Sequence, residues 1–197
     1  MRYPAEQKDE TRAKIISVAS RLFRERGADA SGIGSVMKEI GLTKGGFYRH
    51  FNSRDHLYVE AIDKAFTDMG DAMVAAAEAA PKGQQLKGLI ERYLSLKHLN
   101  SPGSGCVIST LGSDIARRPS PVRQQINRSM QAYRERLLPF MPGKTLEEKA
   151  ATFSLLYPSM VGALIAARTQ ADKQVQERLL ARAREFLIRT YASAEAR

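Results

Sequence analysis

The stretch from Thr43 to Phe51, "TKGGFYRHF", gathers side chains whose chemistry suits a polyanionic partner. Thr43, Tyr48 and His50 can donate hydrogen bonds to phosphate oxygens, and Lys44 can reach either a phosphate or a guanine edge. The two adjacent glycines each lower helix stability by about 1 kcal/mol relative to alanine. We expect these glycines to remove side-chain bulk where the backbone approaches another molecule closely.

Two short helices joined by a tight turn must position this stretch. The apolar spacing predicts a first helix over residues 9–27, a second over 31–41 and a third over 43–51. Ser31 and Thr43 are the expected N-caps, because their side-chain oxygens can accept hydrogen bonds from the first helical amides. The second and third helices together form a predicted helix-turn-helix, whose second helix reads the DNA major groove.

Helical periodicity continues through the rest of the chain, with no sustained period of two. The further expected helices are a long one that ends at Pro81, then segments over 86–99, 106–117, 122–138, 145–169 and from 173 onward. The sequence therefore predicts an all-α fold of about nine helices. We expect residues 1–52 to form a three-helix, helix-turn-helix DNA-binding domain and residues 53–197 a larger helical bundle.

Two aromatic residues of the third helix stand four positions apart, so one face of that helix is apolar. We expect Phe51 to lie in the core. For Phe47 the alternatives of core packing and groove contact stay open, because a helix this short cannot bury one whole face.

The charge balance also favours a polyanionic partner. The 197-residue chain carries 31 lysines and arginines against 21 aspartates and glutamates, a formal net charge of +10. Nucleic acid fits this sign, and a solvated basic surface is the plainer alternative. The single cysteine, Cys106, and an N-terminus without a secretory signal indicate a cytoplasmic protein. No apolar run approaches the roughly 18 residues of a membrane-spanning helix, so no membrane segment is expected.

The segments "TRAKIISVASRLFRERG" and "ASGIGSVMKEIGLTKGGFYRHFNSRDHL" resemble the N-terminal domain of the TetR family of transcriptional repressors. The resemblance spans about Thr11 to Leu57. It implies a dimer that is held together by its last two helices. It also implies that this dimer binds a pseudo-palindromic operator and is released from it by a small-molecule effector. It also places Arg54 at a phosphate-contacting position. The chain departs from the family pattern at Gly32, Met37 and Gly46, and the two glycines lack hydroxyls that would contact DNA.

The expected DNA contacts combine these two lines of reasoning. They are Ser31, Thr43, Lys44, Gly45, Gly46, Phe47, Tyr48, His50 and Arg54.

Methionine and aromatic residues recur at helical spacing on the central helices. They either line a pocket for an apolar effector or simply form core. Cys106 begins a predicted helix, where a thiolate is favoured, and some TetR-type regulators with a similar "GC" element sense electrophiles or oxidants through such a cysteine. Most lone cysteines are packing residues. The candidate effector-pocket residues are Phe66, Met69, Met73, Tyr93, Cys106, Met130, Tyr133, Tyr157 and Met160.

Signals for catalysis are weak. Ser35 and Lys38 match a hydrolase S-x-x-K motif, but its companion motifs are absent. The three histidines lack the spacing of a metal site. We therefore expect neither enzyme activity nor a metal or cofactor. The alternatives are an all-helical carrier or enzyme with an incidental basic surface, and a DNA-binding protein that activates transcription or binds without sequence preference.

Overall fold

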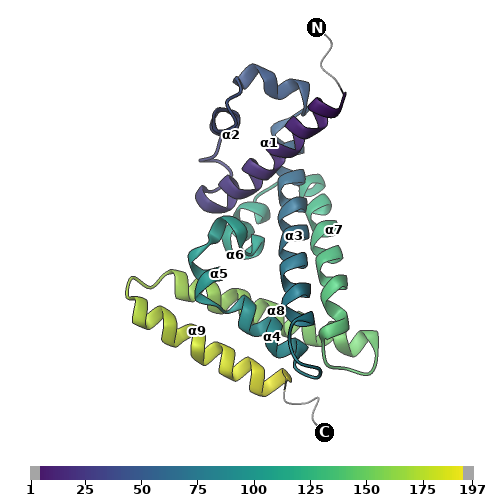
Figure 1. The fold of residues 1–197 in the computed structure, drawn as a ribbon, viewed down its shortest axis with the longest axis vertical. Coiled ribbons are helices and arrows are strands. Elements are labelled where there is room, and N and C mark those ends of the chain that lie inside the picture. The colour runs from purple at the N-terminus through teal and green to yellow at the C-terminus, as the bar shows by residue number, and fades with distance from the viewer. Residues whose placement is uncertain (1–4, 193–197) are drawn as a thin grey trace. The chain divides into compact units, whose positions relative to one another are not determined.

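The computed structural model describes residues 5–192, and every regular element within them is helical (Figure 1). Nine α-helices, α1 to α9, run through these residues, with short 3-10 and π turns between some of them. The predicted all-α fold of about nine helices is confirmed.

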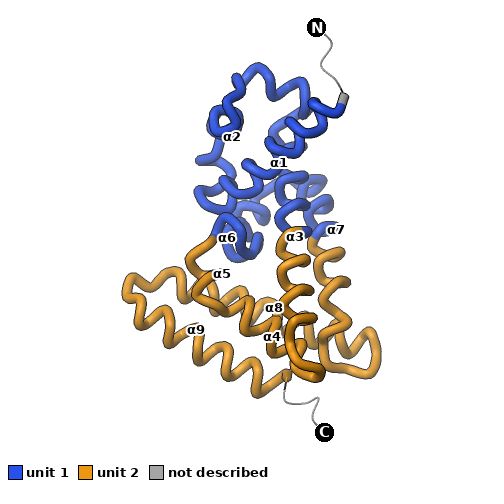
Figure 2. The backbone as a smooth tube through the Cα atoms, in the orientation of Figure 1, with its two compact units in different colours: residues 1–67, 102–129 blue, residues 68–101, 130–197 orange. Residues whose placement is uncertain are grey.

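The chain divides into two compact units, each built from two separate stretches of sequence (Figure 2). Unit 1 comprises Met1–Thr67 and Pro102–Ser129, and unit 2 comprises Asp68–Ser101 and Met130–Arg197. Two of the three boundaries fall inside helices, because α3 (Arg54–Glu78) and α7 (Ser120–Leu137) each contribute residues to both units, and the third lies between residues 101 and 102.

Unit 1 holds the predicted helix-turn-helix. The motif consists of α2 (Ile33–Glu39) and η1 (Lys44–Arg49), and unit 1 also contains α1 (Ala5–Arg26), η2 (Pro102–Ser104) and α6 (Val107–Ala116), besides its parts of α3 and α7. Apolar side chains from four of its elements and the turn after η1 form one core, since none can bury its apolar face alone. The buried members include Ile15, Leu22, Val36, Met37, Phe47, Phe51, Leu57 and Ile62.

Two glycines end the first two helices, as the sequence predicts. Gly27 follows α1 with a φ of 82°, and Gly41 follows α2 with a φ of 73°. Side chains other than glycine rarely adopt this left-handed region, which is where helices commonly stop. The Gly27 amide donates to the carbonyl of Phe23 at 2.9 Å and so satisfies a group at the helix end.

The third helix of the prediction is a 3-10 helix, η1, rather than an α-helix. Two adjacent glycines weaken an α-helix, and short helices commonly take the tighter 3-10 form. Thr43 occupies the N-cap position, as predicted, but its side chain makes no capping hydrogen bond.

The predicted N-cap of α2 is wrong. Gly32 takes that position, and no side chain caps the helix. The hydroxyl of Ser31 instead donates to the carbonyl of Leu22 at 3.1 Å, and Ser31 is only 2% exposed. The turn folds back onto α1, so this bond replaces the expected cap.

Unit 2 contains two long antiparallel helices. Its elements are α4 (Gln85–Tyr93), α5 (Leu96–Asn100), η3 (Leu138–Phe140), α8 (Leu146–Arg168), α9 (Lys173–Leu187) and η4 (Ile188–Ala192). Helices α8 and α9 lie side by side (Figure 1). The helix predicted over 86–99 is divided into α4 and α5, because Ser95 starts a new helix by accepting a hydrogen bond from the His98 amide at 3.1 Å.

A polar network joins α3 to the end of α6 within unit 1. The Tyr58 hydroxyl donates to Asp114 at 2.5 Å, and Arg118 donates to the same carboxylate at 3.0 Å. The Arg118 guanidinium also lies 4.5 Å from the centroid of the Tyr58 ring. Burial, and then the bond to Asp114, raises the pKa of Tyr58 well above its ordinary value of 10.0, so the hydroxyl remains a proton donor.

Replacement of Tyr58 with phenylalanine removes this bond while keeping the ring. We expect Tyr58→Phe to lower the free energy of unfolding by about 2 kcal/mol, because the hydroxyl bonds to a charged and mostly buried carboxylate. Urea denaturation followed by circular dichroism measures the change. The matched control is Tyr48→Phe, whose side chain is 65% exposed and should leave the unfolding midpoint unchanged. Equal midpoints for the two variants would contradict the assigned role of the network.

Alkaline pH tests the same bond independently. Because the folded-state pKa of Tyr58 is raised, its stabilising effect is complete below pH 10.0 and is lost as the pH rises further. The difference in unfolding free energy between wild type and Tyr58→Phe should therefore shrink above that pH. A difference that stays constant between pH 8 and 11 would contradict this linkage.

Candidate nucleic-acid interface

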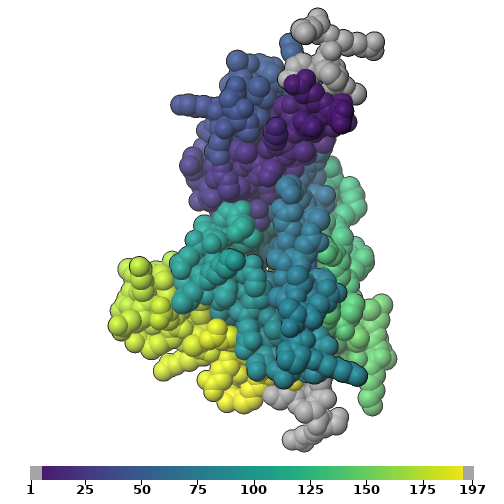
Figure 3. Space-filling model, viewed as in Figure 1, coloured from purple at the N-terminus to yellow at the C-terminus, as the bar shows by residue number. Residues whose placement is uncertain are grey.

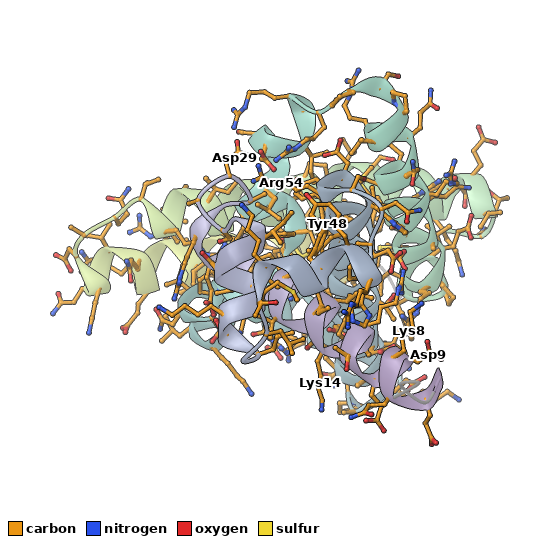
Figure 4. The ribbon with its side chains drawn as sticks, turned by 90° about the horizontal axis from the view of Figure 1, so that it is seen from above. Lys8, Asp9, Lys14, Asp29, Tyr48 and Arg54 are labelled. Carbon is orange, nitrogen blue, oxygen red and sulfur yellow. The ribbon has the colours of Figure 1, made fainter. Side chains whose placement is uncertain are left out.

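Four of the predicted contact residues lie on an open surface of unit 1. Thr43, Lys44 and Gly45 are exposed, and Tyr48 has 65% of its surface accessible. In the space-filling view, α1 and the segment through η1 form one continuous surface of unit 1, in purple and blue (Figure 3). Figure 4 shows Lys8 and Lys14 extending from α1 and Tyr48 from η1.

The burial of two aromatic rings explains this exposure. Phe47 is fully buried and stacks on Phe51, with ring centroids 5.4 Å apart. Tyr48 meets the edge of Phe47 at 5.2 Å and turns outward. With its apolar side chain fixed inward, the short η1 presents its remaining side chains to solvent.

The two glycines of η1 are not required by the packing of the fold. A Cβ atom added to Gly45 would meet nothing within 4 Å, and one on Gly46 would make ordinary contacts, the nearest at 3.7 Å to Met37. Neither residue has the positive φ that demands glycine. The two glycines therefore weaken the helix although neither packing nor backbone conformation requires them. An external molecule that approaches the backbone closely would explain their presence.

Three predicted contact residues are engaged inside the protein instead. Phe47 is buried in the core, so its ring serves core packing rather than groove contact. Ser31 is buried and bonded to α1. Arg54 donates to the Ala28 carbonyl at 2.6 Å and to Asp29 at 3.1 Å, so it holds the turn before α2 (Figure 4). Sequence resemblance identifies the motif positions of these residues. The groups that they contact are set by the folding of the chain and are seen only in the structure.

Sequence reasoning missed a hollow beside η1. It measures about 450 Å³ and is lined by Lys8, Thr11, Leu42, Gly46, Arg49 and His50. Lys8 and Arg49 are 41 positions apart in the sequence, so no spacing pattern could bring them together. Neither forms an ion pair with a carboxylate in the described part of the chain.

His50 carries a buried ring nitrogen at this hollow. Its Nδ1 atom has no hydrogen-bond partner within the described residues. Burial, followed by the positive charges of Lys8, Arg12 and Arg49, lowers the pKa of His50 from its ordinary value of 6.5. The imidazole is therefore neutral at pH 7.

The candidate effector-pocket residues are divided between the two units. Phe66 and Cys106 belong to unit 1, and the other seven belong to unit 2. Eight of the nine are buried, and Met130 is half-buried. Cys106 is fully buried at the start of α6, an environment that restricts access to its thiol.

Unit 2 contains a cluster of aromatic rings that includes three of these residues. Tyr157 lies 5.7 Å from Tyr133, 6.2 Å from Tyr93 and 5.2 Å from Phe153 between ring centroids. Phe153 was not among the predicted pocket residues, although it stands four positions before Tyr157 on α8, where helix residues are neighbours.

Comparisons with known proteins agree with this geometry. Residues 15–61 match the family model described as "Bacterial regulatory proteins, tetR family". The uncharacterized HTH-type transcriptional regulator YxaF of Bacillus subtilis is 27% identical over 170 residues, which cover 83% of this chain and 88% of YxaF. The HTH-type transcriptional regulator TtgR of Pseudomonas putida is 33% identical over 100 residues, which cover 49% of this chain and 47% of TtgR.

A solved structure extends the likeness of fold to nearly the whole chain. The TetR transcriptional regulator from Chloroflexus aurantiacus superposes with a TM-score of 0.73 over 94% of this chain and 98% of that one, at 20% sequence identity. Its identity is low, so this likeness concerns the fold alone. The named relatives are regulators rather than enzymes. The helix-turn-helix lies within the matched residues, so residues 15–61 carry the DNA-binding domain of the TetR family of transcriptional regulators.

Proposed function

We propose that this protein is a ligand-responsive transcriptional repressor that binds a pseudo-palindromic operator as a homodimer in the cytoplasm. The observation that carries the proposal is the open surface of η1, where Lys44 and Tyr48 project from a helix-turn-helix whose apolar residues are buried. In such a motif the second helix enters the major groove and the first crosses the backbone.

Each exposed residue of η1 has a chemically suitable role on DNA. Lys44 reaches a guanine edge or a phosphate, while Thr43 and Tyr48 donate to phosphate oxygens. Gly45 and Gly46 let the backbone come close to the duplex. Phe47, Ser31 and Arg54 position these groups through their contacts inside unit 1, and we do not assign them to the DNA surface.

Helix α8 supports the proposal of a dimer. By length and composition it is apolar enough to cross a membrane, with a mean hydropathy of 1.6. One side packs inside unit 2, but Leu155, Gly162 and Ile165 are exposed on another. No charged residue lies between Lys149 and Arg168. The exposed face of α8 is uncharged and consists of small and apolar residues, while the charged residues lie at the helix ends. Such a face is suited to burial against a second copy of the chain.

A dimer also matches the symmetry of a duplex. Two recognition elements about 34–36 Å apart read two half-sites on one side of DNA, so a two-fold protein binds a pseudo-palindrome. Exposed Phe186 on α9 adds a large apolar side chain to the proposed dimer surface. We therefore place the interface on the last two α-helices.

The proposed effector is an apolar small molecule bound near the aromatic cluster of unit 2. Helix α3 contributes residues to both units, so it offers a covalent route between effector and DNA surface. The effector releases DNA only if it binds more tightly to the conformation that does not fit the operator. The buried position of Cys106 favours a packing role over a sensing one.

One observation separates this proposal from a carrier or an enzyme, and none separates it from an activator. A carrier or enzyme with an incidental basic surface gives no reason for two glycines without packing contacts beside an exposed lysine and tyrosine. An activator shares the entire DNA surface and differs only in where its operator lies relative to the promoter.

The DNA assignment is tested with a duplex selected from a random library. We expect Lys44→Ala combined with Tyr48→Phe to weaken binding to that duplex by about tenfold to a hundredfold, because a base or phosphate contact is worth roughly 1–3 kcal/mol. Fluorescence anisotropy measures the affinity. The control makes the same two changes in unit 2, with Lys97→Ala and Tyr191→Phe, and should bind as wild type does. Unchanged affinity in the first variant would refute the assignment.

The dimer surface is tested at Gly162. A Cβ added there meets nothing within 4 Å, so Gly162→Glu leaves the protomer fold intact. The buried charge at a self-complementary interface should convert the dimer to a monomer in sedimentation equilibrium. Gly34→Glu is the matched control, since a Cβ at Gly34 also meets nothing within 4 Å and lies in unit 1. A Gly162→Glu protein that remains dimeric would exclude this face of α8.

A further inference from the structure

The hollow beside η1 is lined by residues other than Lys44 and Tyr48. Lys8 and Thr11 contribute to it from α1, and Arg49 and His50 from η1 and the residue that follows it. All of these residues belong to unit 1. Two elements distant in sequence thus build one site of about 450 Å³.

The charges at this hollow are all of one sign. Among the residues that line it, Lys8 and Arg49 are cationic and none is a carboxylate, and Lys8, Arg12 and Arg49 all lower the pKa of His50. Arg12 is paired with Glu60 and lies 4.8 Å from the centroid of the Phe51 ring, so its charge is already compensated. Lys8 and Arg49 are left without a carboxylate partner in the described residues.

The lining of the hollow strengthens the effect of these two charges. It is mostly carbon, and Leu42 and Gly46 contribute to it. A concave site with low-dielectric walls and charges of one sign concentrates the electric field and attracts a counter-ion. The buried Nδ1 atom of His50 has no partner in the described residues, so the polar groups of the hollow are incompletely satisfied by the protein.

We propose that this hollow binds a phosphate group of the DNA backbone, held by Lys8 and Arg49. This inference rests on the proposed function, because the same element that lines the hollow carries Lys44 and Tyr48 to the duplex. A guanidinium and an ammonium are the side chains that pair best with phosphate. The contact fixes the register of the protein on DNA and carries no sequence information.

A salt titration tests the proposal. The operator duplex selected by the wild-type protein is titrated with wild type and with Lys8→Gln/Arg49→Gln at a series of NaCl concentrations. One lost phosphate contact in each protomer should reduce the slope of log affinity against log salt by about 0.9, or about 1.8 for a dimer. Binding to selected and random duplexes should weaken by the same factor, because phosphates are present in both.

The control removes equal charge elsewhere. Lys82→Gln/Lys97→Gln replaces two exposed lysines of unit 2, and it should keep the wild-type slope. Lys8 and Arg49 are exposed, so their replacement spares the core, and urea denaturation checks that both double variants unfold at the wild-type midpoint. The single variants Lys8→Gln and Arg49→Gln supply the same test if the double variant is less stable.

The outcomes distinguish failure of the phosphate-site proposal from failure of the proposed function on which it rests. An unchanged slope in a folded Lys8→Gln/Arg49→Gln protein overturns the proposal, while loss of binding in the Lys44 and Tyr48 variant keeps the proposed function. Loss of discrimination between selected and random duplexes also overturns it, since the residues would then read bases. If wild type selects no duplex at all, the proposed function itself fails.

Inorganic phosphate separates a backbone site from a site for a free anion. Titration of phosphate into DNA-free protein, followed by the NMR signals of the His50 ring, should give weak binding that the double variant abolishes. Tight phosphate binding together with an unchanged salt slope on DNA would assign the hollow to a free anion and overturn the proposal.

Discussion

The stacked pair of Phe47 and Phe51 is the contact on which the DNA-facing surface depends. Both rings are buried in the core of unit 1, and their centroids lie 5.4 Å apart. A 3-10 helix of six residues has few positions to divide between core and solvent. Fixing Phe47 inward therefore leaves Lys44, Gly45 and Tyr48 outward. The aromatic pair does not touch DNA in our account, but it determines which side chains can.

A second set of contacts holds the turn between α1 and α2. Arg54 bonds to the Ala28 carbonyl and to Asp29, and Arg118 reaches the same aspartate at 3.3 Å. Because Arg118 also binds Asp114 at the end of α6, one chain of charged groups runs from that helix to the helix-turn-helix inside unit 1. Arg54 thus positions the interface through the protein, although sequence resemblance suggests a phosphate contact for it.

Helix ends and the fold class could be predicted from the sequence because their signals are local. Gly27 and Gly41 stop their helices by adopting a backbone conformation that glycine favours, and apolar spacing reveals the core faces. The 3-10 form of η1 and the bond from Ser31 to Leu22 were not predicted, since they depend on how the turn folds back on α1. The hollow was beyond sequence reasoning for the same reason: Lys8 and Arg49 meet only in three dimensions.

In the proposed function, two copies of this chain read a symmetric DNA sequence. Selection from a random duplex library at about physiological salt, followed by measurement of the mass of the complex with the enriched duplex, tests it most directly. We expect a pseudo-palindrome whose half-site centres are one helical turn apart, bound by two protomers. Enrichment of no sequence, with only weak binding that disappears as salt is raised, would contradict it.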